Sequence, residues 1–196
     1  MTSSRSRQPV GLRERKKAKT RAAIQRHALR LFREQGYAAT TVDQIAEAAE
    51  ISQSTFFRYF PTKEDTVLYD GLDPVLMRVF AEQPAELSPT AAIRTTMRQV
   101  FDSLAGEDWE IEQDRQRLTF EVPELRARAM SQFADGITML AEGAAARLGR
   151  SPDDFEVRNW AGAIIGVILA AMMDRADDGY VRLEEALSHL EAGLPL

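Results

Sequence analysis

Apolar residues recur along most of this chain at spacings of three and four residues, which is typical of helices that bury one face. In residues 13–35 this stripe is formed by Ile24, Ala28, Leu31 and Phe32. Strand-like alternation and Asn-Gly hairpin signals do not occur in the sequence. The pattern therefore predicts an all-α fold.

Two short helices with capping signals follow the first one. Thr41 caps a second helix, with Gln44 completing a capping box, and Ser52 caps a third that runs to about Phe60. Two short helices joined by a tight link have the spacing of a helix-turn-helix.

A fourth helix begins after Thr62, and Asp73 with Pro74 kinks it or divides it into two pieces. Further helices are predicted over residues 90–105, 107–120, 123–148, 155–175 and 181–194. We therefore expect a flexible basic arm over residues 1–12, a helix-turn-helix domain over 13–62 and a helical-bundle domain over 63–196.

Charge is distributed unevenly between the two ends of the chain. Residues 1–35 hold eleven basic and two acidic residues, whereas the whole chain of 196 residues has a net charge of −5. A basic head on an acidic body indicates a polyanion as the partner of the head.

The composition also excludes several kinds of chemistry. Cysteine is absent and only two histidines occur, His27 and His189, so we expect no metal site, no cofactor and no cysteine nucleophile. Phosphate-binding glycine motifs and a Glu-x-x-His motif are also missing, so an enzyme is not expected. The N-terminus lacks a secretory apolar region and the longest apolar run has 14 residues, so a cytoplasmic protein without a membrane span is expected.

The predicted third helix has an outer face suited to duplex DNA. Its first residues are short and polar and the later ones are aromatic; amide, hydroxyl and aromatic groups of this kind read bases, and neighbouring hydroxyls and cations bind phosphates. A small all-helical enzyme, or an adaptor without sequence-specific DNA binding, is the alternative.

Two stretches resemble the N-terminal domain of TetR-family transcriptional regulators: TTVDQIAEAA over residues 40–49 and ISQSTFFRYFPTKE over residues 51–64. The resemblance covers residues 17–68 and implies a three-helix DNA-binding head, an all-helical ligand domain, a homodimer and regulation of transcription, most simply as a repressor. Carried over, the base-facing residues are Gln53, Ser54, Thr55 and Phe57. The residues that match the phosphate contacts are Thr41, Tyr59 and Lys63.

One position departs from the family pattern. Glu50 stands in the turn where the family often has glycine. Either Glu50 adopts a left-handed conformation, which costs on the order of 1 kcal/mol, or the turn has a different shape. Together with the VPELRAR stretch at residues 122–128, the sequence is similar to the mycofactocin-regulator subgroup, whose members are thought to sense acyl-CoA-type ligands. The expected effector is therefore a small apolar or acyl-CoA-like molecule.

A ligand pocket is expected in the helical body, and plain core packing is the alternative for each lining residue. The candidate lining residues are Met97, Phe101, Leu118, Met130, Phe133, Ile137, Asn159, Trp160 and Ile164. Arg115 and Arg117 lie in an acidic stretch, where they either meet a ligand anion or form surface ion pairs.

Small residues recur every four positions on the penultimate helix, which lets two helices approach closely, within one chain or between two copies. We expect this helix and the last one to form the dimer interface, through Gly162, Gly166, Ala170, Leu183, Leu187 and Leu190.

Overall fold

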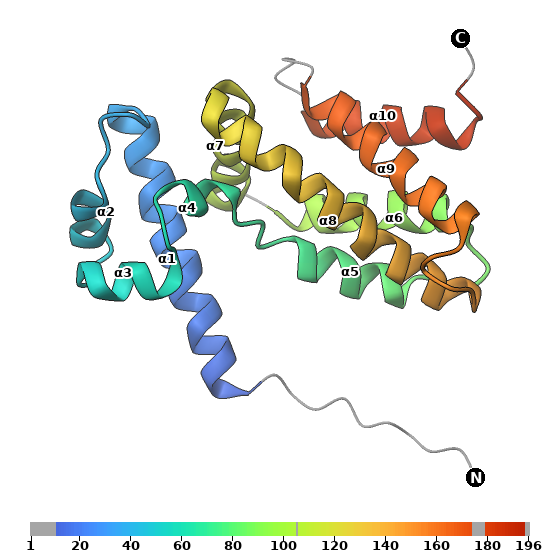
Figure 1. Ribbon diagram of the computed structural model, residues 1–196, viewed down its shortest axis with the longest axis horizontal. Helices are drawn as coiled ribbons and strands as arrows, with labels where there is room; N and C mark the ends of the chain where they lie inside the picture. Colours follow the sequence, from blue (N-terminus) through green and yellow to red (C-terminus); the bar gives the residue numbers. More distant parts are fainter. Residues whose placement is uncertain (1–10, 105, 174–178, 195–196) are drawn as a thin grey trace. The chain divides into compact units, whose positions relative to one another are not determined.

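The computed structural model describes residues 11–104, 106–173 and 179–194, and within these ranges it is helical with no strand (Figure 1). The prediction of an all-α fold is confirmed. The chain divides into two compact units, Met1–Val67 and Leu68–Leu196. The arm expected over residues 1–12 lies almost entirely outside the described residues.

The first unit contains α1 (Leu12–Gln35), α2 (Val42–Ala48), α3 (Gln53–Tyr59) and most of α4 (Glu64–Leu68). Helix α2 packs against both α1 and α3. The small core is formed by one face of each helix, with Ile24, Leu29, Ile45, Phe56 and Phe60 almost completely buried. Burial of these large side chains holds together helices that are too short to be stable alone.

The predicted caps define where these short helices begin. The Thr41 hydroxyl accepts from the Gln44 backbone N–H while the Gln44 side chain accepts from the Thr41 N–H, which confirms the capping box. The Ser52 hydroxyl accepts from the Thr55 N–H at 3.1 Å. At the start of α4, Asp65 accepts from the backbone N–H of Thr62 at 2.9 Å. Each cap supplies an acceptor for a helix N-terminal donor that would otherwise lack one.

The turn between α2 and α3 contains a left-handed residue, which is the first of the two alternatives that the sequence leaves open. Glu50 has φ 53°, and the following Ile51 N–H donates to the Ala46 carbonyl at 2.9 Å. Glu50 is exposed, so its side chain is not crowded by the core, and the energetic cost comes from the left-handed backbone conformation.

The predicted break after α4 is also present. Helix α5 (Asp73–Glu82) begins as a separate element, with Leu72 rather than Asp73 at the N-cap position and Pro74 in the first turn. Proline is tolerated there because the first helical N–H groups have no intrahelical partner.

The second unit is a helical bundle of α5, α6 (Pro89–Ser103), α7 (Glu107–Glu121), α8 (Pro123–Leu148), α9 (Phe155–Met173) and α10 (Gly179–Glu191). Helix α9 packs between α8 and α10, while α5 packs on α6 and α8 (Figure 1). Phe80, Ile93, Leu140 and Ile164 belong to one buried core. At Gly143 a Cβ atom would collide with Met77 and Phe80, so glycine allows the close approach of α5 to α8.

Helix α9 is long and apolar enough to cross a membrane by length and composition alone. The 14-residue run expected from the sequence is thus part of a 19-residue helix. Val157, Ala161 and Ile164 are buried in the bundle core, as in the core helix of a globular unit. Only 22% of the most apolar 18-residue window is buried, however, so much of this helix has no cover within the described part of its own chain.

Replacing Glu50 with glycine should stabilise the first unit by about 0.5–1 kcal/mol, because glycine adopts positive φ without steric cost. Urea unfolding of the full chain measures the change. The matched control is Glu47→Gly, an exposed position inside α2, where the same substitution should destabilise by about 1 kcal/mol. The same sign in both variants would contradict a strained turn at Glu50.

Candidate functional site

The outer face of α3 is a ridge of exposed side chains. Gln53, Ser54 and Arg58 are exposed, and Phe57 keeps 50% of its surface accessible although it is a large aromatic residue. The neighbouring Phe56 is completely buried, and its ring meets that of Phe57 edge to face with centres 5.5 Å apart. The outer face of α3 therefore has a polar N-terminal end and one half-exposed aromatic group that covers the edge of the core.

Thr55 occupies a less accessible place than the rest of the predicted base-facing set. It is half-buried, and its hydroxyl accepts from the Ser52 hydroxyl at 3.0 Å. The structure therefore brings Gln53, Ser54 and Phe57 together on the outer ridge, with Thr55 at its edge and engaged in the cap.

The three residues expected at phosphates flank this ridge, and each has a structural contact as well. Thr41 is exposed at its cap, and Tyr59 is half-buried with Arg58 over its ring. The Lys63 ammonium donates to the carbonyls of Tyr37 and Thr40 at 2.9 and 3.0 Å. It also lies 4.5 Å from the centre of the Tyr37 ring. Lys63 thus ties the start of α4 to the α1–α2 connection, and it leaves a single N–H for another partner.

The N-terminal half of α1 adds positive charge to the first unit. Arg13, Arg15, Lys16, Lys17 and Lys19 are all exposed. Arg21 is different, because its guanidinium donates to the Tyr59 carbonyl at 3.1 Å and lies over the Phe60 ring. Arg21 therefore positions the end of α3.

A cavity of about 500 Å³ lies within the second unit. Residues from the α4–α5 link and from α5 to α10 line it, and most of them are apolar or aromatic. This volume is in the range of sites that bind small organic molecules.

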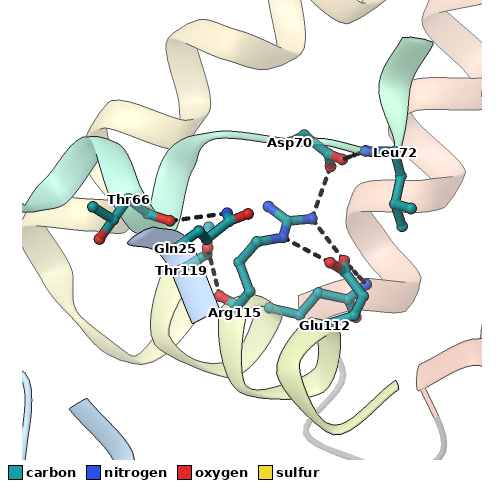
Figure 2. Close-up of polar contacts among 8 residues, drawn as sticks. Gln25, Thr66, Asp70, Leu72, Glu112, Arg115 and Thr119 are labelled. Atoms are coloured by element: carbon teal, nitrogen blue, oxygen red, sulfur yellow. Dashed lines mark hydrogen bonds and ion pairs between the residues drawn. The ribbon is translucent and has the colours of Figure 1, made fainter. Parts of the chain in front are cut away.

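One wall of the cavity carries a cluster of charged side chains centred on Arg115 of α7 (Figure 2). The Arg115 guanidinium donates from Nη2 to Asp70 Oδ2 and to Glu112 Oε1, both at 2.7 Å, and from Nε to Glu112 Oε2 at 2.8 Å. The other Asp70 carboxylate oxygen accepts from the Leu72 N–H at 2.8 Å. Arg115 and Glu112 are buried, with side-chain exposures of 9% and 10%. The cluster joins the α4–α5 link to α7.

The electrostatic environment of the cluster favours the charged form of the arginine. Burial disfavours the Arg115 cation, but the carboxylates of Asp70 and Glu112 outweigh this and raise its pKa. Asp73, which also lines the cavity, is affected in the opposite sense. Burial, with the negative charge of Asp70, raises the pKa of the Asp73 carboxyl to about 6, although Arg115 favours its charged form.

Three of the predicted pocket residues line the cavity, namely Met97, Phe101 and Phe133. The other six lie elsewhere: Leu118, Met130, Ile137, Asn159, Trp160 and Ile164. Ile164 is buried in the core, Met130 is exposed, and the Asn159 amide donates to the Phe155 carbonyl one turn earlier. Trp160 stacks on Phe80 and donates to the Thr90 hydroxyl at 2.9 Å.

The rotation of α9 explains why Trp160 and Ile164 do not line the cavity. Ile165, Ile168 and Met172 of α9 line the cavity, while Trp160 and Ile164 pack into the core. Because α9 is apolar around most of its surface, the sequence pattern does not distinguish a core-facing position from a cavity-facing one. The acidic neighbours of Arg115 mark it as a candidate in the sequence. No local pattern places Asp70 and Asp73 near Arg115, because both lie far away in the sequence.

The residues expected at a dimer interface fall into two groups. Leu183 and Leu187 of α10 are 5% and 1% exposed, because they pack into the core of their own chain, and Leu190 is partly buried against it. Gly166 and Ala170 of α9 are exposed and Gly162 is half-buried. A Cβ atom at Gly162 or Gly166 would meet no atom of the described residues within 4 Å. Close packing inside this unit therefore does not explain these two glycines.

Arg115→Met should destabilise the second unit by about 3–5 kcal/mol, because Glu112 and Asp70 would keep their negative charge without a cationic partner. Arg158→Met is the matched control, since Arg158 of α9 also pairs with an aspartate, Asp153, but the two side chains are 50% and 90% exposed. The control should lose less than about 1 kcal/mol. Thermal unfolding of the two variants makes the comparison, and equal losses would contradict a structural role for the buried cluster.

Comparison with known proteins agrees with this arrangement. Residues 24–68 match the family described as "Bacterial regulatory proteins, tetR family", and residues 87–195 match the "MftR C-terminal domain". The second match covers more than half of the chain.

Curated relatives are similar over most of their length. The HTH-type transcriptional regulator TcmR of Streptomyces glaucescens is 35% identical over 188 residues, which span 92% of this chain and 81% of TcmR. The putative mycofactocin biosynthesis transcriptional regulator MftR of Mycobacterium tuberculosis is 28% identical over 162 residues, or 82% of this chain and 81% of MftR.

A solved structure shows the same fold. Thermus thermophilus FadR, described as a transcriptional repressor in complex with lauroyl-CoA, aligns with a TM-score of 0.54 and 25% identity, over 90% of this chain and 95% of FadR. These relatives are transcriptional regulators rather than enzymes, and this chain is a ligand-responsive, DNA-binding regulator of transcription. On the two family matches and the similarity to TcmR, the chain belongs to the tetR family of bacterial regulatory proteins.

Proposed function

We propose that this protein is a cytoplasmic, homodimeric repressor that leaves its operator when a small molecule occupies the cavity of the second unit. The observation that carries the proposal is the exposed ridge of α3, which is capped by Ser52, packed from behind through the buried Phe56 and part of a unit whose α1 presents several exposed cations. Each copy would place this ridge in a major groove, with half-sites about one helical turn or somewhat more apart.

The contacts with DNA divide into two classes. Gln53, Ser54 and Phe57 read base edges, with Thr55 contributing from the rim of the ridge. Thr41, Tyr59 and the remaining N–H of Lys63 contact phosphates, and the exposed cations of α1 add affinity that does not depend on sequence.

A second copy of the chain would cover α9. This helix is apolar, much of it is unburied, and Gly162 and Gly166 face open space in their own chain. Small residues in a row allow the backbones of two helices to approach closely. We therefore assign Gly162, Gly166 and Ala170 to the interface, with the partly buried Leu190 at its edge, and assign Leu183 and Leu187 to the core of each copy. Members of this family act as dimers.

The effector would act on the segment that connects the two units. Tyr69, Asp70 and Leu72 of the α4–α5 link all line the cavity, and Asp70 is held by Arg115. A bound molecule that alters these contacts would alter a segment covalently continuous with α4 of the DNA-binding unit. FadR was solved with lauroyl-CoA, and a large apolar lining here also suits a molecule with an extended apolar part.

Gln53→Ala should weaken binding to the preferred operator by about 1–3 kcal/mol and relax base preference at one position, because an exposed amide is lost without a change in the core. Lys17→Ala, on α1, is the matched comparison and should weaken binding uniformly and reduce the salt slope by about one. Fluorescence anisotropy on operators selected from a random duplex library measures both. Unchanged base preference in Gln53→Ala would remove Gln53 from the reading set.

Gly166→Leu should convert the dimer to monomer, because a bulky side chain would stand where the partner helix approaches. The fold should persist, since a Cβ atom there meets nothing in its own chain, and circular dichroism checks this. Ala146→Leu, at an exposed position of α8, is the control and should remain dimeric. Light scattering gives the mass, and an unchanged dimer in Gly166→Leu would place the interface elsewhere.

A further inference from the structure

We propose that the cavity of the second unit is selective for a compact, largely apolar aromatic molecule that carries a positive charge, such as a lipophilic amine or quaternary cation. The inference rests on the proposed function, because it specifies the chemistry of the effector that this same cavity takes. It departs from the acyl-CoA-like effector expected from the sequence.

The first observation is the balance of charge on the cavity wall. Four carboxyl groups line it, and Arg115 is the single cation among the lining residues that the structure describes. The carboxyl groups come from the α4–α5 link, α5, α7 and α8, as Asp70, Asp73, Glu112 and Asp135. The residues that α6, α9 and α10 contribute to the lining are uncharged. With every group ionised, the wall has a net charge of −3.

The second observation is that Arg115 is already engaged. Its Nη2 and Nε atoms donate to Asp70 and Glu112 at 2.7–2.8 Å, and the guanidinium is buried. Among the described residues no acceptor meets Nη1, but the single positive charge that Arg115 could offer a ligand carboxylate or phosphate is already offset by two carboxylates. Arg115 therefore stabilises the wall, and the three groups together carry a net negative charge that disfavours an anion.

The third observation concerns Asp73. In the described part of the chain, no hydrogen bond or ion pair holds its carboxylate in the way that Arg115 holds Asp70 and Glu112. It lines the cavity, and its pKa of about 6 reflects a charge that burial and Asp70 disfavour and that Arg115 only partly compensates. A bound cation would supply the missing compensation.

The rest of the cavity suits the body of such a molecule. Phe101, Trp109, Phe120 and Phe133 line it, and the rings of Phe101 and Trp109 meet edge to face with centres 6.1 Å apart. Aromatic faces attract a cation within about 6 Å of the ring centre. A volume of about 500 Å³ admits a compact aromatic molecule.

A pair of ions with almost the same shape and opposite charge tests the sign of this selectivity. Tetraphenylphosphonium and tetraphenylborate are titrated into the full-length protein in a calorimeter, with lauroyl-CoA as a third ligand. The cation should bind at least about tenfold more tightly than the anion, the fold-change expected of one partly screened carboxylate contact. Equal binding of both ions, binding of neither, or a preference for tetraphenylborate or lauroyl-CoA would overturn the proposal.

Asp73→Asn identifies the carboxylate responsible. The variant keeps the shape of the side chain and should bind tetraphenylphosphonium about tenfold more weakly. Asp153→Asn is the matched control, because this exposed aspartate of the α8–α9 loop lies outside the cavity. An unchanged affinity in Asp73→Asn would contradict the assignment of the cation site to Asp73 and would overturn the proposal.

The pH dependence separates a direct charge contact from a structural effect. The phosphonium ion does not titrate, whereas Asp73 is protonated below its pKa of about 6. Affinity should therefore fall about fivefold as the pH is lowered from 7 to 5 in the natural protein, since the protonated carboxyl binds about as weakly as the asparagine. Asp70, Glu112, Asp135, Arg115 and Tyr69 are the other ionisable groups of the wall, and they remain in Asp73→Asn. The profile of this variant should be flatter, and an identical slope would contradict the role of Asp73.

An electrophoretic mobility shift assay tests the proposed function and the proposed ligand charge separately. Binding of the unliganded protein to its selected operator tests the proposed function alone, and release of that DNA by tetraphenylphosphonium links the cavity to it. If the DNA is never bound, the regulator proposal fails, while calorimetry still decides the charge preference of the cavity. If DNA is bound but only the anionic ligands release it, the cation proposal fails and the regulator proposal stands.

Discussion

The buried contact of Arg115 with Asp70 and Glu112 determines both the architecture and the chemistry of the second unit. It attaches the segment that follows α4 to helix α7, and therefore decides which residues of that segment face the cavity. Burying these charges is costly unless each one has a partner. Once the arginine is occupied by two carboxylates, the remaining carboxyl groups of the wall give the cavity a surplus of negative charge.

The first unit depends on a different constraint, the shortness of its helices. Helices α2 and α3 have seven residues each, too few to persist alone, so caps and the buried side chains behind them hold the ridge in place. The side chains that maintain this geometry differ from those left to contact DNA. Phe56 and Arg21 position α3 from within, which leaves Gln53, Ser54 and Phe57 at the surface.

Much of this organisation could be predicted because its signals are local. The starts of the helices could be predicted from Thr41 with Gln44, from Ser52 and from Pro74. The hydrogen bonds at a helix N-terminus involve residues only three or four positions apart. The sequence also located Glu50 as the position of possible backbone strain, but only the structure decided that its backbone is left-handed. The cavity lining was only partly predictable, since α9 is apolar on several faces and its rotation depends on the helices against which it packs.

By itself, the sequence determined the helical class, the helix-turn-helix with its caps, the basic head and three of the four residues expected on the outer face of α3, namely Gln53, Ser54 and Phe57. These follow from periodicity, capping and charge, which operate over a few neighbouring residues. Only the tertiary structure decided that Leu183 and Leu187 belong to the core, that Ile165 rather than Ile164 faces the cavity, and that Arg115 is neutralised by Asp70 from 45 positions away. The reason is physical: burial and ion pairing depend on which surfaces meet in space, and no local pattern of residues specifies that meeting.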